Sequence, residues 1–124
     1  MVAIAPNSYP SVLARVQRSA VISQADGLRQ LTIHAMNTVC RVHCAGGDAR
    51  VVGEFQQEAL RWVAWFEAQY SRFIPDSLVG RINAAAGEHW VDIDAETEAL
   101  LKLCGEMTFF TQGTFDPTAL PLIR

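Results

Sequence analysis

The stretch that most constrains the fold is residues 50–70, which has the spacing of an amphipathic helix. Its apolar residues Phe55, Ala59, Trp62 and Phe66 recur at intervals of four, three and four. Residues at these intervals share one side of an α-helix, and such a stripe is stable only when a second layer covers it. We therefore predict a long helix whose stripe lies in the main core.

The residues before this helix predict a half-buried strand and a turn. Residues 31–44 contain many β-branched side chains, and their second half has a period of two. In that half, Cys40, Val42 and Cys44 oppose Arg41 and His43. Residues 45–48, Ala-Gly-Gly-Asp, then supply the turn. Residues 1–30 are a lead segment with several prolines, in which a short helix is expected from Ser11.

A second helical region follows the same strand-and-helix order. Ser77 or Asp76 is expected to cap a short helix running to Asn83, and His89–Ile93 alternates as a short strand does. Asp94 is a good N-cap for a second long helix, which ends near Gly113. The expected buried face of that helix is Leu100, Leu103, Cys104, Met107 and Phe110. This order of elements predicts an α+β fold, and its few short strands suggest that the sheet is incomplete.

Composition bounds the class of protein. The chain has 124 residues, enough for one domain, and a net charge of −3, which gives no footprint for nucleic acid. No apolar run approaches the ~20 residues that span a bilayer. The chain has three cysteines, an odd number, which argues against a disulfide framework. Cys40-x-x-x-Cys44 is a poor zinc signature because no second ligand pair follows. A cytoplasmic protein with reduced cysteines is expected.

Three segments contain residues that core packing explains poorly: His34–Thr38, Ser71–Ser77 and Gly113–Thr118. From residue type alone, Met36 is an ordinary core residue and Phe73 an ordinary loop anchor. Asp116 precedes a proline, which biases it toward extended backbone. Its carboxylate suits either a turn-stabilising role or a contact to a ligand's hydroxyl or amine. The residues by themselves do not decide between these interpretations.

Taken in order, the motifs resemble those of the ApbE family of FAD:protein FMN transferases. The family has a Met-Gly-Thr strand, an S-x-[YF]-x-x-[DN]-S-x-[LIV]-x-x-[LI]-N stretch and a G-[AT]-F-D-[PI]-T-x-x-P-L segment. The corresponding residues here are Met36-Asn37-Thr38, Ser71–Ser77 with Arg81-Ile82-Asn83, and Gly113–Thr118 with Pro121-Leu122. The resemblance covers residues 31–124. One departure is Asn37, which stands where the family has a glycine that permits close backbone approach.

The resemblance implies a fold and a set of contacts. The fold is an antiparallel, T-fold-like sheet with the two long helices packed on one face, of which residues 31–124 would be a truncated N-terminal portion. The positions that fall on FAD-contacting residues of the family are Met36, Phe73, Thr114, Phe115 and Asp116. A thioether and aromatic rings suit a planar flavin or adenine, and Asp116 suits a donor on the ribose or adenine.

The resemblance also implies a reaction. Members transfer FMN from FAD to a Ser or Thr of a target flavoprotein and release AMP, with Mg²⁺ neutralising the phosphates. The family's metal ligands and catalytic residues lie mostly downstream of the position of Pro121-Leu122, so no catalytic or metal residue is assigned here. The leading hypothesis is a fragment or truncated member that is inactive alone. The alternatives are a non-enzymatic flavin-binding or interaction module completed by homo-oligomerisation, and a remnant of a larger enzyme.

Overall fold

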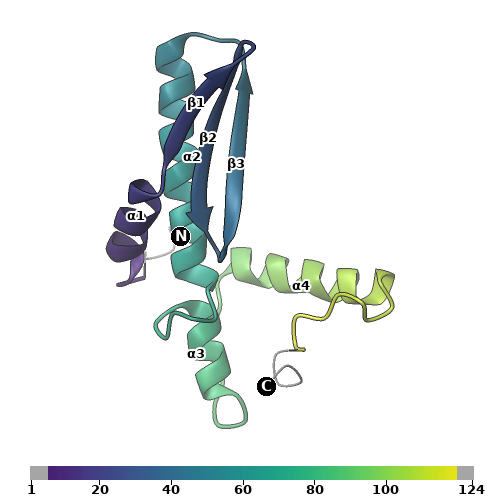
Figure 1. The fold of residues 1–124 in the computed structure, drawn as a ribbon. Coiled ribbons are helices and arrows are strands. Elements are labelled where there is room, and N and C mark those ends of the chain that lie inside the picture. Colours follow the sequence, from purple (N-terminus) through teal and green to yellow (C-terminus); the bar gives the residue numbers. More distant parts are fainter. Residues whose placement is uncertain (1–5, 120–124) are drawn as a thin grey trace. The chain divides into compact units, whose positions relative to one another are not determined.

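The computed structural model describes residues 6–119 and confirms the α+β class (Figure 1). The chain divides into two compact units, Met1–Val91 and Asp92–Arg124, and each is described by itself. The elements of the first unit are α1 (Tyr9–Arg18), β1 (Val21–Ala25), β2 (Leu28–Ala35), β3 (Thr38–Ala45), α2 (Ala49–Tyr70) and α3 (Leu78–Ala85). The second unit contains α4 (Ala95–Phe110).

The three strands form one antiparallel sheet in the order β1-β2-β3. Two-residue turns join them, at Asp26-Gly27 and at Met36-Asn37, and all four of these residues have positive φ. Positive φ at both central residues is what a type I′ hairpin requires, because its twist matches that of the flanking strands. The single strand predicted over residues 31–44 is therefore wrong, since the chain reverses direction at Met36-Asn37.

The lead segment contributes more structure than the sequence predicted. Helix α1 begins at Tyr9 rather than Ser11, with Pro10 in its first turn, and β1 was not predicted at all. Asp26-Gly27 is a strong hairpin signal and accounts for β1. Both elements belong to the same compact unit as the rest of the sheet.

Helices α1 and α2 pack against each other and against the sheet, and the core lies between these layers. Its buried members are Val12, Val16, Leu31, Ile33, Ala35, Leu60, Ala64 and Ala68. Full burial of one Leu, Ile or Val side chain contributes about 1.5–3 kcal/mol. On β3 the predicted alternation holds, because Cys40, Val42 and Cys44 are half-buried while Arg41 and His43 are exposed.

Helix α2 confirms the predicted helix but not its predicted core stripe. Its buried apolar residues include Leu60, Ala64 and Ala68, whereas Phe55 and Trp62 are 55% and 56% exposed. Alanines at the contact let α1 and the sheet approach closely, which leaves no room there for large rings. The aromatic side chains lie on a different face, where Trp62 and Phe66 contact each other at 5.5 Å between ring centroids.

The predicted caps of the later helices are confirmed. Ser77 caps α3 by accepting from Gly80 N–H, and Asp94 caps α4 by accepting from Thr97 N–H at 2.8 Å. Gly113, with a φ of 82°, takes the left-handed conformation expected after a helix.

Two other predictions in this region are wrong. Residues His89–Ile93 form no strand, because alternation in one segment cannot supply the second strand with which it must pair. Of the predicted face of α4, Leu103, Met107 and Phe110 are exposed, and Leu100 and Cys104 are only half-buried. The described part of the second unit, residues 92–119, forms one helix and a turn, so these residues contain no second layer that would bury this face.

Candidate functional site

The first wall of the candidate site is the tip of the β2–β3 hairpin. Met36 and Asn37 have φ values of 52° and 58°, a left-handed conformation that glycine and asparagine tolerate best. This backbone explains why the family has a glycine at the second turn position and why Asn37 is an acceptable replacement. The turn brings the side chain of Met36 to the end of the sheet, rather than into the middle of a strand.

The second wall is the C-terminal turn of α2. The rings of Phe66 and Tyr70 lie one helical turn apart, with their centroids separated by 4.8 Å. Residues four apart lie on the same side of a helix, so the two rings extend the surface that Met36 begins. Between them on the chain, the side chain of Glu67 is only 11% exposed, and its carboxylate forms a 2.6 Å ion pair with Arg15 of α1.

The third wall is the loop from Ser71 to Ser77. Helix α2 ends at Ser71, which has extended backbone, and the Ser71 hydroxyl accepts a 3.3 Å hydrogen bond from the backbone N–H of Phe73. The guanidinium carbon of Arg72 lies 4.7 Å from the centroid of the Phe73 ring, a cation–π contact. Phe73 itself is 71% exposed, so its ring is available to a ligand.

Ser77 and Gly80, at the start of α3, hold this loop in place. The sequence did not single out Gly80 as a residue of the site. Ser77 is fully buried, and its hydroxyl donates to the Ser71 carbonyl at 2.6 Å. A Cβ at Gly80 would overlap with the carbonyl oxygens of Ile74 and Pro75. The N-terminal turn of α3 therefore approaches the loop so closely that only glycine fits.

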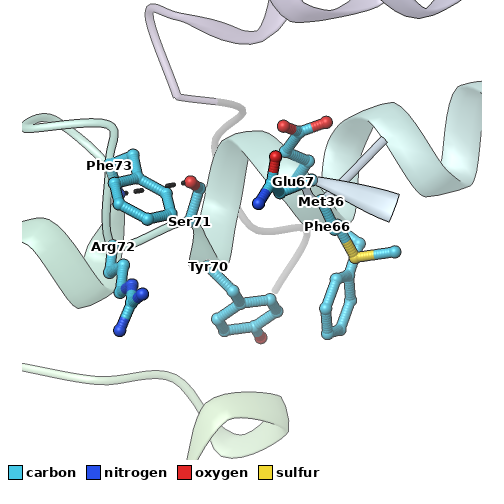
Figure 2. Close-up of a pocket in the computed structure, with 8 residues that line it drawn as sticks. Met36, Phe66, Glu67, Tyr70, Ser71, Arg72 and Phe73 are labelled. Atoms are coloured by element: carbon cyan, nitrogen blue, oxygen red, sulfur yellow. Dashed lines mark hydrogen bonds between the residues drawn. The ribbon is translucent and has the colours of Figure 1, made fainter. Parts of the chain in front are cut away.

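The three walls enclose one pocket with a volume of about 220 Å³. Its lining residues are Met36, Asn37, Phe66, Glu67, Tyr70, Ser71, Arg72 and Phe73. In Figure 2, the side chains of Met36, Phe66 and Tyr70 point to one side, and Phe73 and Arg72 lie at the other end. Small-molecule sites usually occupy roughly 300–1,000 Å³, so this pocket suits one ring system rather than a whole dinucleotide.

The structure thus brings together two of the five predicted contact residues, Met36 and Phe73. The sequence did not predict that Phe66 and Tyr70 would join them. Phe66 was assigned to the core stripe, and a signal for its true position lay in its helical spacing to Tyr70, close to the predicted loop.

The other three predicted contact residues lie in the second unit, just after α4. The Thr114 N–H donates to the Thr111 carbonyl at 3.0 Å, and Phe115 is 43% exposed. The Asp116 carboxylate accepts from the backbone N–H and the hydroxyl of Thr118, at 2.8 and 2.7 Å. These hydrogen bonds, the one from the side chain first, lower the pKa of the Asp116 carboxyl below its ordinary value. Asp116 is therefore an ionised acceptor at neutral pH. Pro121-Leu122 lies outside the described residues.

Among residues 6–119, no group of three or more His, Cys, Asp or Glu side chains is placed to hold a metal ion. The Mg²⁺ that the resemblance implies is therefore not assigned to any residue of this part of the chain. Over the same residues, no helix is both long and apolar enough to cross a lipid bilayer. The cytoplasmic location stays a prediction.

Comparison with protein families agrees with the motifs in the pocket and in the turn after α4. A family model described as "ApbE family" matches residues 36–124. The match spans well over half of the chain, so this protein belongs to the ApbE family. At the level of the family, the activity is that of an FAD:protein FMN transferase, with FAD as the substrate and a flavoprotein as the target. Comparisons with curated proteins and with solved structures gave no match.

Proposed function

We propose that this chain supplies the FAD-contacting part of a flavin transferase, with the pocket as the seat of one planar ring of FAD. The observation that carries the proposal is that Met36 and Phe73, far apart in the sequence, line one pocket together with Phe66 and Tyr70. A thioether and three aromatic rings offer polarisable surface to a flavin or an adenine. No catalytic role is proposed for these residues.

The second part of the proposal concerns Thr114, Phe115 and Asp116, which we propose as further FAD-contacting residues. The ionised, exposed carboxylate of Asp116 would accept a hydrogen bond from a ribose hydroxyl or from the adenine amine. When bound, FAD supplies the FMN group that is transferred to a Ser or Thr of the target flavoprotein and the AMP that leaves. The residues named here bind and orient FAD.

The experiment is a flavin titration of the 124-residue chain and its variants, followed by quenching of flavin fluorescence. Removing a ring that stacks on a nucleobase costs roughly 1–3 kcal/mol, so Phe73→Ala should weaken FAD binding by about tenfold or more. Met36→Ala should weaken it by about threefold to tenfold.

The matched control is Phe55→Ala, which removes an exposed phenylalanine of α2 that does not line the pocket. Its affinity for FAD should equal that of the wild type. If Phe73→Ala and Phe55→Ala bind FAD equally well, the assignment of the pocket is wrong. A parallel assay with FAD, Mg²⁺ and a flavoprotein acceptor tests transfer. We expect no AMP release by this chain alone, since the family's metal ligands lie mostly beyond the position of Pro121-Leu122.

A second candidate function is a non-enzymatic flavin-binding or interaction module completed by oligomerisation. The exposed rings of Phe55 and Trp62 on α2 favour it, as does strand β1, whose five residues are all exposed at the edge of the sheet. Sedimentation equilibrium distinguishes the two functions. A stable dimer that dissociates on Trp62→Glu would support the module, whereas a monomer that binds FAD would support the first function.

A further inference from the structure

We propose that Arg15 of α1 is a positioning residue for the flavin pocket, because it fixes the hairpin tip that carries Met36 relative to helix α2. Its role in flavin binding rests on the function proposed above. Arg15 precedes the residues matched by the family model, which begin at Met36, so the family motifs give no account of it.

The side chain of Arg15 makes two contacts: one to Glu67 in the wall formed by α2, and one to the strand that leads into the hairpin tip. One guanidinium nitrogen, Nη2, lies 2.6 Å from the carboxylate of Glu67, which lines the pocket on α2. The other, Nη1, donates a 3.3 Å hydrogen bond to the carbonyl oxygen of His34. His34 lies two residues before Met36 on β2. A guanidinium presents several donors in a rigid plane, so one side chain links the two walls at a fixed spacing.

The same stretch of α1 also holds the N–H of His34. The backbone N–H of His34 donates to the Ser19 hydroxyl at 3.0 Å, and that hydroxyl donates to the Val16 carbonyl at 2.7 Å. The last residue of β2 that pairs with β1 is Thr32, so His34 lies on β2 two residues beyond the part that β1 covers. Arg15 and Ser19 therefore bind the edge of β2 where β1 no longer does, immediately before the Met36-Asn37 turn.

The burial of Glu67 gives the contact its strength. The Glu67 side chain is only 11% exposed, and an ion pair with one partner mostly buried is screened less than a surface pair. Removing the arginine leaves a nearly buried carboxylate without its cation, which favours a rearrangement that exposes it to water.

A merely structural role for Arg15, in holding α1 on α2, predicts a different result from a positioning role. The first test needs no flavin. The methyl group of Met36 lies in a pocket lined by aromatic rings, so its NMR shift reports its position. Arg15→Met should shift the Met36 methyl signal and leave that of Met107 unchanged. Arg18→Met is the matched control, because Arg18 lies on the same helix and its side chain makes no ion pair or hydrogen bond with any described residue.

The second test is a double-mutant cycle on FAD binding, with FAD titrated into the full chain. Arg15→Met should weaken binding by about tenfold, a typical coupling for residues in one network. In the Met36→Ala background the same substitution should change affinity by less than about twofold, because the residue on which it acts is absent. Arg18→Met should change affinity in neither background.

Three outcomes would overturn the proposal: an unmoved Met36 methyl signal, an unchanged affinity, or an equal loss of affinity in both backgrounds. If Arg15→Met does not fold, Arg15→Lys and Ser19→Ala replace it. Lysine at this position keeps the charge pair with Glu67 but cannot also reach the His34 carbonyl. The Met36 methyl shift and the FAD affinity of Arg15→Lys should therefore lie between those of the wild type and those of Ser19→Ala. If the wild type binds no flavin, the proposed function fails while the methyl shift still decides the role of Arg15.

Discussion

The hydroxyl of Ser77 donates a 2.6 Å hydrogen bond to the Ser71 carbonyl and accepts one of 2.9 Å from the Gly80 N–H. One buried side chain thus joins the end of α2 to the start of α3, and the loop between them carries Phe73. The two serines and the intervening aromatic residue of the family motif are therefore a structural unit, in which the serines hold the loop and the aromatic ring faces the pocket.

The first prediction concerns this unit. Ser77→Ala removes a helix cap and leaves the partly buried Ser71 carbonyl without its donor, so the free energy of unfolding should fall by about 2 kcal/mol. Urea denaturation measures it. Ser11→Ala is the control, because the Ser11 hydroxyl makes one exposed hydrogen bond to the Ser8 carbonyl. Equal losses in the two variants would contradict the special role of Ser77.

The second prediction compares two helical glycines. Ala at Gly80 would overlap with the carbonyl oxygens of Ile74 and Pro75, so Gly80→Ala should destabilise the protein by about 1–3 kcal/mol. At Gly53 of α2 nothing lies within 4 Å of the added Cβ. Gly53→Ala should therefore stabilise the protein by about 0.5–1 kcal/mol, through helix propensity alone. Thermal or urea unfolding should show changes of opposite sign in the free energy of unfolding of the two variants. If both variants are less stable than the wild type, the close backbone approach at Gly80 is not the cause of its effect.

The third prediction concerns Asp116, whose two interpretations the structure sharpens. Its carboxylate already holds a local turn through Thr118, as the turn-stabilising interpretation expects. If it also contacts FAD, Asp116→Ala should weaken flavin binding by about tenfold to hundredfold in titrations. Thr118→Val removes one hydrogen bond of the turn but keeps the carboxylate, so its affinity for FAD should stay near that of the wild type. If the wild type and Asp116→Ala bind FAD with equal affinity, Asp116 only stabilises the turn and does not contact the ligand.

The fourth prediction concerns pH and the cap of α4. Hydrogen bonds from Thr97, with its side chain first and its backbone second, lower the pKa of the Asp94 carboxyl in the folded protein. The capping stability is therefore fully present above the ordinary aspartate pKa of about 3.9 and is lost as the pH falls through the lower folded value. Asn caps helices without titrating. Circular dichroism at 222 nm should show that wild type loses helix on acidification relative to Asp94→Asn, and parallel curves would contradict the cap's dependence on charge.

Local chemistry predicted the helices well. The caps Ser77 and Asp94 and the left-handed Gly113 all use interactions within a few residues, and each lies where the sequence predicted it. Asp26-Gly27 carries an equally local signal, from which strand β1 is predictable. By contrast, Met36-Asn37 lacks the usual glycine, and the apolar period continues on both sides, so a hairpin was read as one strand.

The buried faces and the pocket depend on packing between distant residues. Which side of α2 is buried depends on how closely α1 and β2 approach, and the small side chains of Ala64 and Ala68 decide it rather than the aromatic rings. The five contact residues came from the family resemblance. Residue type alone leaves Met36 as a core residue, and only the folded hairpin brings it to Phe66 and Tyr70.

Because the turn at Met36-Asn37 has only two residues, the orientation of the β3 side chains depends more on the number of residues in the turn than on which residues they are. If the two-residue turn were kept, one inserted residue would shift β3 by one position and turn its side chains to the opposite face, placing Arg41 and His43 against α2 and exposing Cys40 and Val42. Two inserted residues would restore the alternation and only lengthen the tip. Evolution can therefore exchange side chains at this site within what left-handed backbone tolerates, whereas an odd change in chain length also requires a longer loop or a bulge to keep β3 in register.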